Sequence, residues 1–288
     1  MDKFSGRIVL IGKNSFIGKK ILTDLIKKEI NCIALGRDNL DLTLSSANLK
    51  LEEMLNEGDT VIAISAIVPC KSIEDLHKNI MIAENLFKAF SAVKLRQIVN
   101  VSSDAVYPDS DSPINEDFLP SPSTIHGLMH FSRELIINGL KNVPVCHVRP
   151  TAVFGLNDPH NSYGPNRFIK EALNNQSITI FGEGKELRDF ISISEVASLV
   201  TRIVFKKSSG VYNAVSGKSV SFLEIAQAIS SMSKIPINKL PQSLGNTINN
   251  RREFNANKTH LEFPLIFQDD PINLILNLYQ DLTKNRNS

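Results

Sequence analysis

Two histidines, His126 and His130, lie four residues apart in a segment whose apolar residues recur at helical spacing. This spacing predicts a helix from about Ile125 to Leu140, in which residues four apart share one face. An imidazole titrates near pH ~6.5, so either ring can exchange a proton at neutral pH. The pair could also bind a metal ion. Gly127 stands where the HExxH pattern has glutamate, however, and no metal is predicted.

A glycine turn lies near the start of the chain, in the segment RIVLIGKNSFIGKK. The apolar run from Ile8 to Ile11 predicts a strand that is buried on both faces. Gly12, Ser15 and Gly18 follow, and residues 21–30 then recur at helical period. A strand, a glycine turn and a helix in succession open a dinucleotide-binding fold, where N–H groups at the helix N-terminus meet a pyrophosphate. A tight turn without a ligand is the alternative interpretation.

The residues after the second predicted strand, Asn31 to Leu35, bear on the choice of dinucleotide. An acidic residue at this strand end binds the ribose 2′-hydroxyl of NAD, whereas an arginine accommodates the 2′-phosphate of NADP. Arg37 occupies this place and favours NADP, while the adjacent Asp38 is a counterargument. An exposed loop arginine is the alternative. Asp41 is expected near the adenine. We predict NADP as the cofactor, with NAD possible.

The elements that would position these residues alternate along the chain. Apolar strands are predicted at 59–65, 97–102 and 144–148, and helices at 73–92 and 125–140. This alternation predicts a parallel, doubly wound sheet with right-handed crossovers. Ligands in such sheets bind beyond the carboxyl ends of the strands. Ser65 and Ala66, and further along Ser103 and Asp104, follow strands and are therefore expected at that edge.

Composition excludes several classes of function. The chain has 288 residues and a formal net charge of +2, so no broad basic surface for nucleic acid is expected. No apolar run reaches the roughly 18 residues that a membrane span requires. The first strand follows the N-terminal residues directly, which predicts no signal peptide. The three cysteines are scattered and odd in number, as in reduced thiols, and a cytoplasmic protein is predicted.

Several motifs occur in an order typical of one family. They are the glycine turn, Asn79, SSDAVY at 102–107, RPTAVFG at 149–155, and FGEG…RDFI at 181–191. From Ile8 to about Leu261 the chain resembles the extended short-chain dehydrogenases/reductases of the NAD-dependent epimerase/dehydratase family, which modify nucleotide-linked sugars. The resemblance implies an α/β fold with a Rossmann-type doubly wound parallel sheet and a smaller C-terminal substrate-binding lobe. It implies an NAD(P)-binding lobe at 1–157 and about 189–213, and a nucleotide-sugar lobe at about 158–188 and 214–288.

The resemblance, together with the turn, assigns binding residues by position. The expected cofactor contacts are Gly12, Ser15, Phe16, Ile17, Gly18, Arg37, Asp41, Ser65, Ala66, Asn79, Pro150 and Val153. The expected substrate contacts are Asn166 on the diphosphate, the backbone from Ile178 to Phe181 on the base, and Arg188 and Arg252 on the diphosphate. A guanidinium suits a phosphate because its fork bonds in a bidentate way. A surface or interlobe salt bridge is the alternative for each arginine.

The family's catalytic pattern is broken in this chain. Relatives use a serine or threonine together with YxxxK, whose tyrosine moves the proton of a sugar hydroxyl while the lysine holds the cofactor ribose. Ser103 keeps the serine position, but His126 stands at the tyrosine position and His130 at the lysine position. Asp104 remains where family dehydratases carry an acidic pair, and Ala105 replaces its second member. This substitution favours oxidoreduction or epimerisation over dehydration.

Three interpretations follow from the two histidines. In the favoured one, the chain is an NADP(H)-dependent nucleotide-sugar reductase or epimerase in surface polysaccharide or glycoconjugate synthesis. Its catalytic residues would be Ser103, His126 and His130, with Asp104 as an acid or merely a loop cap. In the second, the chain binds NAD(P) or a nucleotide sugar without turnover, and in the third the histidines hold a metal. The resemblance also implies a homodimer.

Overall fold

The computed structural model describes residues 4–159, 161, 163–241, 251–264, 266–267 and 269–287. These residues form two compact units. Unit 1 lies within Met1–Pro108, Glu116–Pro150 and Val196–Ala214, and unit 2 within Asp109–Asn115, Thr151–Glu195 and Val215–Ser288. Residues 109–115, 151–157 and 189–195, expected in the NAD(P)-binding lobe, thus belong to unit 2. Which unit binds which ligand stays a prediction.

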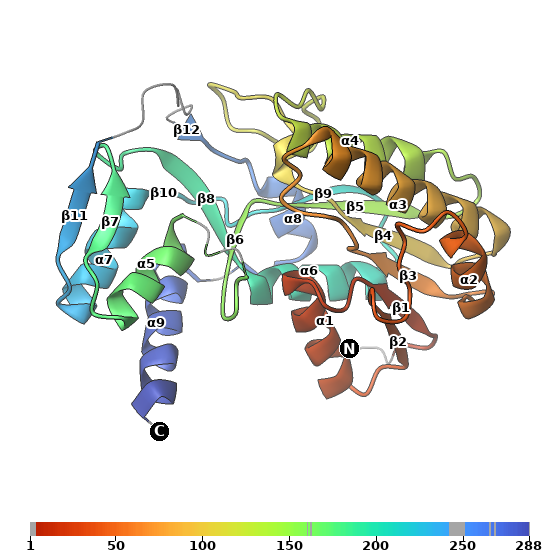
Figure 1. Cartoon of the computed structure of the whole chain (residues 1–288), viewed down its shortest axis with the longest axis horizontal. Coiled ribbons are helices and arrows are strands. Elements are labelled where there is room, and N and C mark those ends of the chain that lie inside the picture. Colours follow the sequence, from red (N-terminus) through yellow and green to blue (C-terminus); the bar gives the residue numbers. More distant parts are fainter. Residues whose placement is uncertain are drawn as a thin grey trace. The chain divides into compact units, whose positions relative to one another are not determined.

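Unit 1 is built around a six-stranded sheet in the order β2-β1-β3-β4-β5-β9 (Figure 1). Its strands are β1 (Ile8–Ile11), β2 (Cys32–Leu35), β3 (Thr60–Ala63), β4 (Gln97–Val101), β5 (Val145–Pro150) and β9 (Gly210–Ala214). Every neighbouring pair in this sheet is parallel. The strand order reverses between β1 and β3, because the chain passes from β2 back across β1. This reversal is where open α/β sheets form a ligand crevice.

Helices cover both faces of the unit 1 sheet, as the doubly wound prediction requires. They are α1 (Phe16–Lys27), α2 (Ala47–Met54), α3 (Ile73–Ala92), η1 (Asp104–Val106), α4 (Ile125–Asn138) and most of α6 (Ile193–Lys206). Figure 1 shows α1 and α6 on one face and α3 and α4 on the other. The Rossmann-type architecture is therefore confirmed.

Side-chain caps set where these helices begin. The Ser72 hydroxyl accepts the N–H of Asp75, and the Asp75 carboxylate accepts the N–H of Ser72. This capping box starts α3. Thr124 accepts the N–H of Gly127 and starts α4 at Ile125. Strands β1, β3 and β4 are buried along their whole length, which explains why most of their residues are apolar, although Thr60, Gln97 and Asn100 are buried polar members. Helix α4 contacts η1, which follows the carboxyl end of β4.

Unit 2 contains a small mixed sheet centred on β8 (Leu187–Ser192). This strand pairs with β10 (Ser219–Ser221) antiparallel, and with β12 (Arg251–Arg252) and β6 (Ala152–Phe154) parallel. Separately, β7 (Ile178–Phe181) pairs in parallel with β11 (Ile237–Leu240). The helices of unit 2 are α5 (Pro165–Leu173), α7 (Phe222–Ser233), α8 (Asn257–Glu262) and α9 (Pro271–Asn287). No helix in the described part of the chain combines the length and the apolarity needed to cross a membrane.

Candidate active site

A pocket of about 310 Å³ lies at the carboxyl ends of β1, β2 and β3 in unit 1. Its lining comprises Gly12, Asn14, Ser15, Gly36, Arg37, Leu40, Asp41, Leu42, Thr43, Ser65, Ala66 and Ile82. Gly12 has a φ of +108°, and a Cβ there would lie 2.9 Å from the Ser65 amide nitrogen. A Cβ on Gly18 would lie 2.1 Å from the Gly12 carbonyl oxygen. The two glycines therefore allow α1 to begin directly against the turn.

The Ser15 hydroxyl is engaged within this turn. It accepts the N–H of Gly18 at 3.0 Å and donates its own hydrogen to the Gly12 carbonyl at 2.8 Å. Ser15 therefore caps α1, and its hydrogen is directed to the protein rather than to a phosphate. Phe16 and Ile17 form the first turn of α1, whose amides are the groups that attract an anion.

The lining of this pocket fits a dinucleotide. Leu40, Leu42 and Ile82 offer apolar surface to a flat base, while the N-terminus of α1 suits a pyrophosphate. The Asp41 carboxylate accepts both the N–H and the hydroxyl of Thr43, at 3.0 and 2.7 Å, and is thus held locally. The apolar side chains, the polar residues of the turn and the N-terminus of α1 all match the dinucleotide that the sequence predicts here.

Asp38, the acidic residue that argues against NADP in the sequence, forms two side-chain contacts beside the glycine turn. Its carboxylate accepts from Lys13 Nζ at 2.7 Å and from Asn14 Nδ2 at 3.2 Å. These contacts, the lysine first, lower the pKa of Asp38 below its ordinary value. Arg37 is exposed and lines the pocket. The acidic side chain is therefore partly neutralised, and the arginine remains at the pocket wall.

Three other expected cofactor residues lie elsewhere in the structure. Asn79 is buried, and its amide bonds the N–H and carbonyl of Ile67 at 2.8 and 3.0 Å and the Asp75 carbonyl at 2.9 Å. It thus holds the loop that follows β3. Pro150 ends β5, and Val153 belongs to β6 in unit 2.

His126 and His130 lie together on α4, as their spacing predicts. Their ring centroids are 4.9 Å apart and the rings meet edge to face, at 81°. His130 is buried, and the pKa of its imidazole is held well below the ordinary value by burial and then by His126 and Arg133. Burial also lowers the pKa of His126, against a smaller opposing effect of the Asp104 carboxylate. Both rings are therefore neutral at pH 7.

Cys70 meets His126 from the loop after β3, a contact absent from the sequence predictions. The Cys70 N–H donates to Nδ1 of His126 at 3.3 Å. A ring that accepts at Nδ1 carries its proton on Nε2 when neutral. In this arrangement Nε2 can act only as a donor, and taking up a proton there requires the other tautomer.

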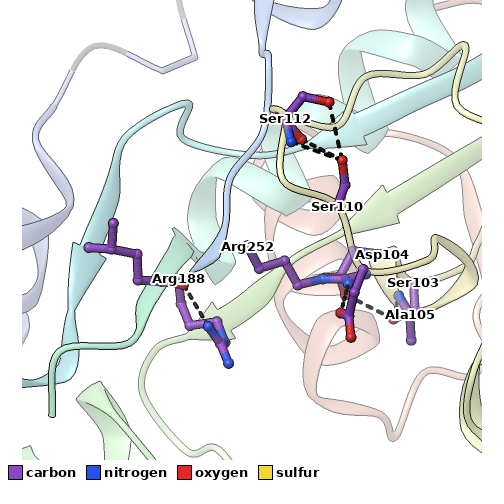
Figure 2. A network of polar contacts seen from close by, with 9 residues as sticks. Ser103, Asp104, Ala105, Ser110, Ser112, Arg188 and Arg252 are labelled. Carbon is purple, nitrogen blue, oxygen red and sulfur yellow. Dashed lines mark hydrogen bonds and ion pairs between the residues drawn. The ribbon is translucent and has the colours of Figure 1, made fainter. Parts of the chain in front are cut away.

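Ser103 and Asp104 follow β4 and lie at the start of η1 (Figure 2). The Ser103 hydroxyl accepts the N–H of Ala105 at 3.1 Å and faces the Asp104 carboxylate at 3.3 Å. Ser103 thus caps the short helix as well as occupying the family's serine position. Asp104 lies close enough to act on the pKa of His126, and His126 packs against His130, so all four predicted catalytic side chains share one neighbourhood of unit 1.

A third candidate role for the histidines, metal binding, lacks further ligands. Across the residues that the structure describes, no three His, Cys, Asp or Glu side chains gather as a metal ion would require. Protein metal sites need three or four ligands. The histidine pair therefore has no third protein ligand among the described residues, and the absence of a metal stays a prediction.

In unit 2, Arg188 and Arg252 are register partners on the adjacent parallel strands β8 and β12. Partners in a parallel pair project to the same face of the sheet. Arg188 donates to the Leu187 carbonyl at 2.7 Å, as Figure 2 shows, and Arg252 donates to Asp109 at 3.3 Å. Two cations 64 positions apart in the chain are thus brought to one face of one small sheet.

The other expected substrate contacts are engaged within unit 2. Asn166 accepts the N–H of Gly155 at 3.0 Å and donates to Asp158 at 2.9 Å. On β7, the edge N–H of Phe181 donates to the Tyr163 hydroxyl at 3.0 Å. The N–H of Thr179 likewise donates to Glu171 at 2.8 Å. A base that pairs with this strand would therefore meet amides that already have side-chain acceptors, and the base contact from Ile178 to Phe181 stays a prediction.

Comparison with known proteins now identifies the family. The model of the NAD dependent epimerase/dehydratase family matches residues 8–215. The chain belongs to this family. A putative UDP-glucose 4-epimerase of Methanocaldococcus jannaschii is 27% identical over 247 residues, covering 77% of this chain and 81% of that protein. A dTDP-D-glucose 4,6-dehydratase of Dictyostelium discoideum is 26% identical over 275 residues, covering 81% of this chain and 63% of that protein.

A solved structure agrees with the fold of the family. MoeE5 in complex with UDP-glucose and NAD has a TM-score of 0.86 at 20% identity, covering 98% of this chain and all of that one. At this identity the likeness concerns the fold alone, and it confirms the Rossmann-type prediction.

Proposed function

We propose that the chain is an NAD(P)-dependent nucleotide-sugar epimerase or reductase that acts at a sugar carbon. The observation that supports this most is the pocket at the strand-order reversal of unit 1, whose glycine turn, apolar walls and helix terminus fit a dinucleotide. Family membership and the paired arginines of β8 and β12 support a nucleotide-sugar substrate. A role in making surface polysaccharide or another glycoconjugate follows from the same substrate class.

The residues beside the pocket have distinct roles in this proposal. The bound nicotinamide supplies hydride acceptance or donation. Ser103 donates its hydroxyl hydrogen to the reacting sugar oxygen, in place of its contact with Asp104. His126 moves the proton of that oxygen through Nε2, which requires its Nδ1 to release the Cys70 N–H and carry the ring proton instead. His130, packed against His126, fixes the orientation of that ring.

Within this proposal NADP is the preferred cofactor, because Arg37 lies exposed at the pocket wall while Asp38 is held by Lys13. Arg37→Ala is expected to weaken NADPH binding about tenfold and to leave NADH binding unchanged. The increase in nicotinamide fluorescence on binding measures both affinities. Equal effects on the two dinucleotides would show that Arg37 does not contact the 2′-phosphate, and NAD would then be the natural cofactor.

A second candidate function is binding without turnover, and one observation favours it. The Cys70 N–H on Nδ1 of His126 stabilises the tautomer that cannot accept a proton at Nε2. No ammonium stands at the lysine position, which His130 occupies. A protein of this kind would sense or store a dinucleotide or a nucleotide sugar.

One experiment separates the two candidates. Purified protein is incubated with NADPH or NADP⁺, and separately with NADH or NAD⁺, and a panel of UDP-, dTDP- and GDP-sugars. Nicotinamide absorbance reports net reduction, and chromatography of the sugars reports epimerisation, which leaves the absorbance unchanged. New sugar products support the enzyme. Thermal stabilisation by a panel member without any product supports the binding protein.

A further inference from the structure

The guanidinium of Arg133 is buried in unit 1, and no described residue provides it with a counter-ion. The residue is 2% exposed. Its Nη1 donates to the Ser65 carbonyl at 2.6 Å, whereas Nε and Nη2 meet no acceptor in the described part of the chain. The neighbouring Glu134 is already bound to Arg149 through two hydrogen bonds of 2.9 and 2.6 Å. A buried charge with unmet donors is costly, so another group is expected to meet them.

The position of Arg133 indicates which group that is. Arg133 lies three residues after His130 on α4, which places both side chains on one face of the helix. Its anchor, Ser65, lines the dinucleotide pocket together with Ala66. Nδ1 of His130 is also buried and lacks a partner among the described residues. Two unpaired donors of Arg133 and one unpaired ring nitrogen of His130 thus lie on the same helix, which contacts the pocket wall through Ser65.

We propose that Arg133 is a dinucleotide-binding residue whose open Nε and Nη2 groups hold the vicinal ribose hydroxyls on the nicotinamide side. This proposal rests on a dinucleotide binding in unit 1, which both candidate functions require. Two adjacent N–H donors match two adjacent hydroxyl oxygens. His130 is neutral and shorter than the lysine whose position it occupies, so the positive charge of the site lies one turn further along α4.

The test compares ligands that contain or lack this ribose. Arg133→Met keeps most of the side-chain length and removes the charge and the donors. We expect about 10- to 100-fold weaker binding of NADH or NADPH, measured by nicotinamide fluorescence, because hydrogen bonds from a charged group are lost. ADP contains the adenosine half of the dinucleotide and lacks the nicotinamide ribose. Its affinity, measured by calorimetry, should therefore be the same for Arg133→Met as for the wild type. Arg133→Lys, whose single ammonium cannot serve both Ser65 and a diol, should also weaken NADH selectively.

Thermal unfolding without ligand distinguishes this role from a structural one. Removing a buried charge that lacks a counter-ion should leave the Tm of Arg133→Met unchanged or raise it. Two results together would show a structural role and overturn the proposal. They are a lower Tm or failure to fold of Arg133→Met, and a ratio of NADH to ADP affinity in Arg133→Lys that equals that of the wild type. Wild-type protein that binds neither NADH nor NADPH would contradict the proposed function itself. Tight binding by the wild type and equally tight binding by both variants would overturn only the role of Arg133.

Discussion

His126 occupies the position on which turnover depends in our proposal. Replacing it with alanine removes the proton-transferring ring and leaves the pocket at β1 and β3 untouched, because His126 does not line that pocket. We expect His126→Ala to lower kcat by about 10²- to 10⁴-fold, the usual contribution of a general acid or base. Dinucleotide affinity, measured by fluorescence titration, should change little. Unchanged kcat on a nucleotide sugar that the wild type converts would remove His126 from the mechanism.

His147 is a buried histidine outside the site, and its environment predicts how stability varies with pH. It lies on β5, where Nδ1 contacts the amide nitrogen of Asn100 at 3.0 Å and Nε2 contacts Oδ1 of Asn138 at 2.9 Å. The amide nitrogen can only donate and the amide oxygen can only accept, so the ring is neutral with its proton on Nε2. Burial lowers the pKa of His147 to about 4.

This lowered pKa makes the folded chain less stable in acid. Between pH ~6.5 and 4 the unfolded chain binds a proton at His147 and the folded chain does not, so the free energy of unfolding falls as pH decreases through this range. The loss amounts to at most about 3 kcal/mol. Urea denaturation at pH 7 and pH 4.5 measures it, and His147→Gln, which cannot titrate, should show a smaller decrease. An equal decrease in both proteins would contradict the assignment.

At the scale of elements, the sequence predicts the helices and strands that local patterns encode. It does not predict contacts between segments that lie far apart in the chain. The strands β1, β3 and β4 are predictable because each is a short segment rich in apolar, mostly β-branched residues. Helix α3 matches its predicted range because Ser72 and Asp75 form a capping box. The contact of Cys70 with His126 spans 56 positions and depends on the path of the loop after β3. No local pattern encodes that path, so the contact and its effect on the tautomer could not be predicted from the sequence.

The same distinction between local patterns and long-range contacts explains why Arg133 on α4 is not among the predicted site residues. Arg133 shares a helical face with His130, so its position is readable from spacing alone. Its importance appears only when Ser65, 68 positions away, is seen to be its anchor and two of its donors remain unmet. Burial of a charge is a property of the tertiary structure, and an arginine in a helix more often lies at the surface.

The pairing of β8 with β12 yields a prediction about the substrate. Arg188 and Arg252 share one face of this sheet, and both are expected to bind the diphosphate of the nucleotide sugar. Replacing either with methionine should weaken UDP binding about 10- to 100-fold, measured by calorimetry. The double variant should lose less than the product of the two effects, because both groups bind one ligand.

Arg251 is a matched control for this experiment. It precedes Arg252 on β12, and successive residues of a strand project to opposite faces. Its Nε donates to Glu253, and its side chain is largely exposed. Arg251→Met should therefore leave UDP affinity unchanged, and an effect as large as that of Arg252→Met would indicate nonspecific attraction between cations and phosphate.

At the scale of the whole molecule, the division into two units predicts that different ligands protect different parts of the chain. A bound ligand slows hydrogen exchange most where it contacts backbone or stabilises local structure. NADPH or NADH should protect amides of 12–18 and 65–66, which belong to unit 1. UDP should protect amides of 187–192 and 251–252, which belong to unit 2. Mass spectrometry of deuterium uptake with each ligand alone measures both patterns. Because the lining of the dinucleotide pocket lies in unit 1 and the arginine pair lies in unit 2, we expect each pattern to appear without the other ligand. Protection of 12–18 by UDP alone, with 187–192 unchanged, would place the nucleotide in the wrong unit and contradict the assignment of both sites.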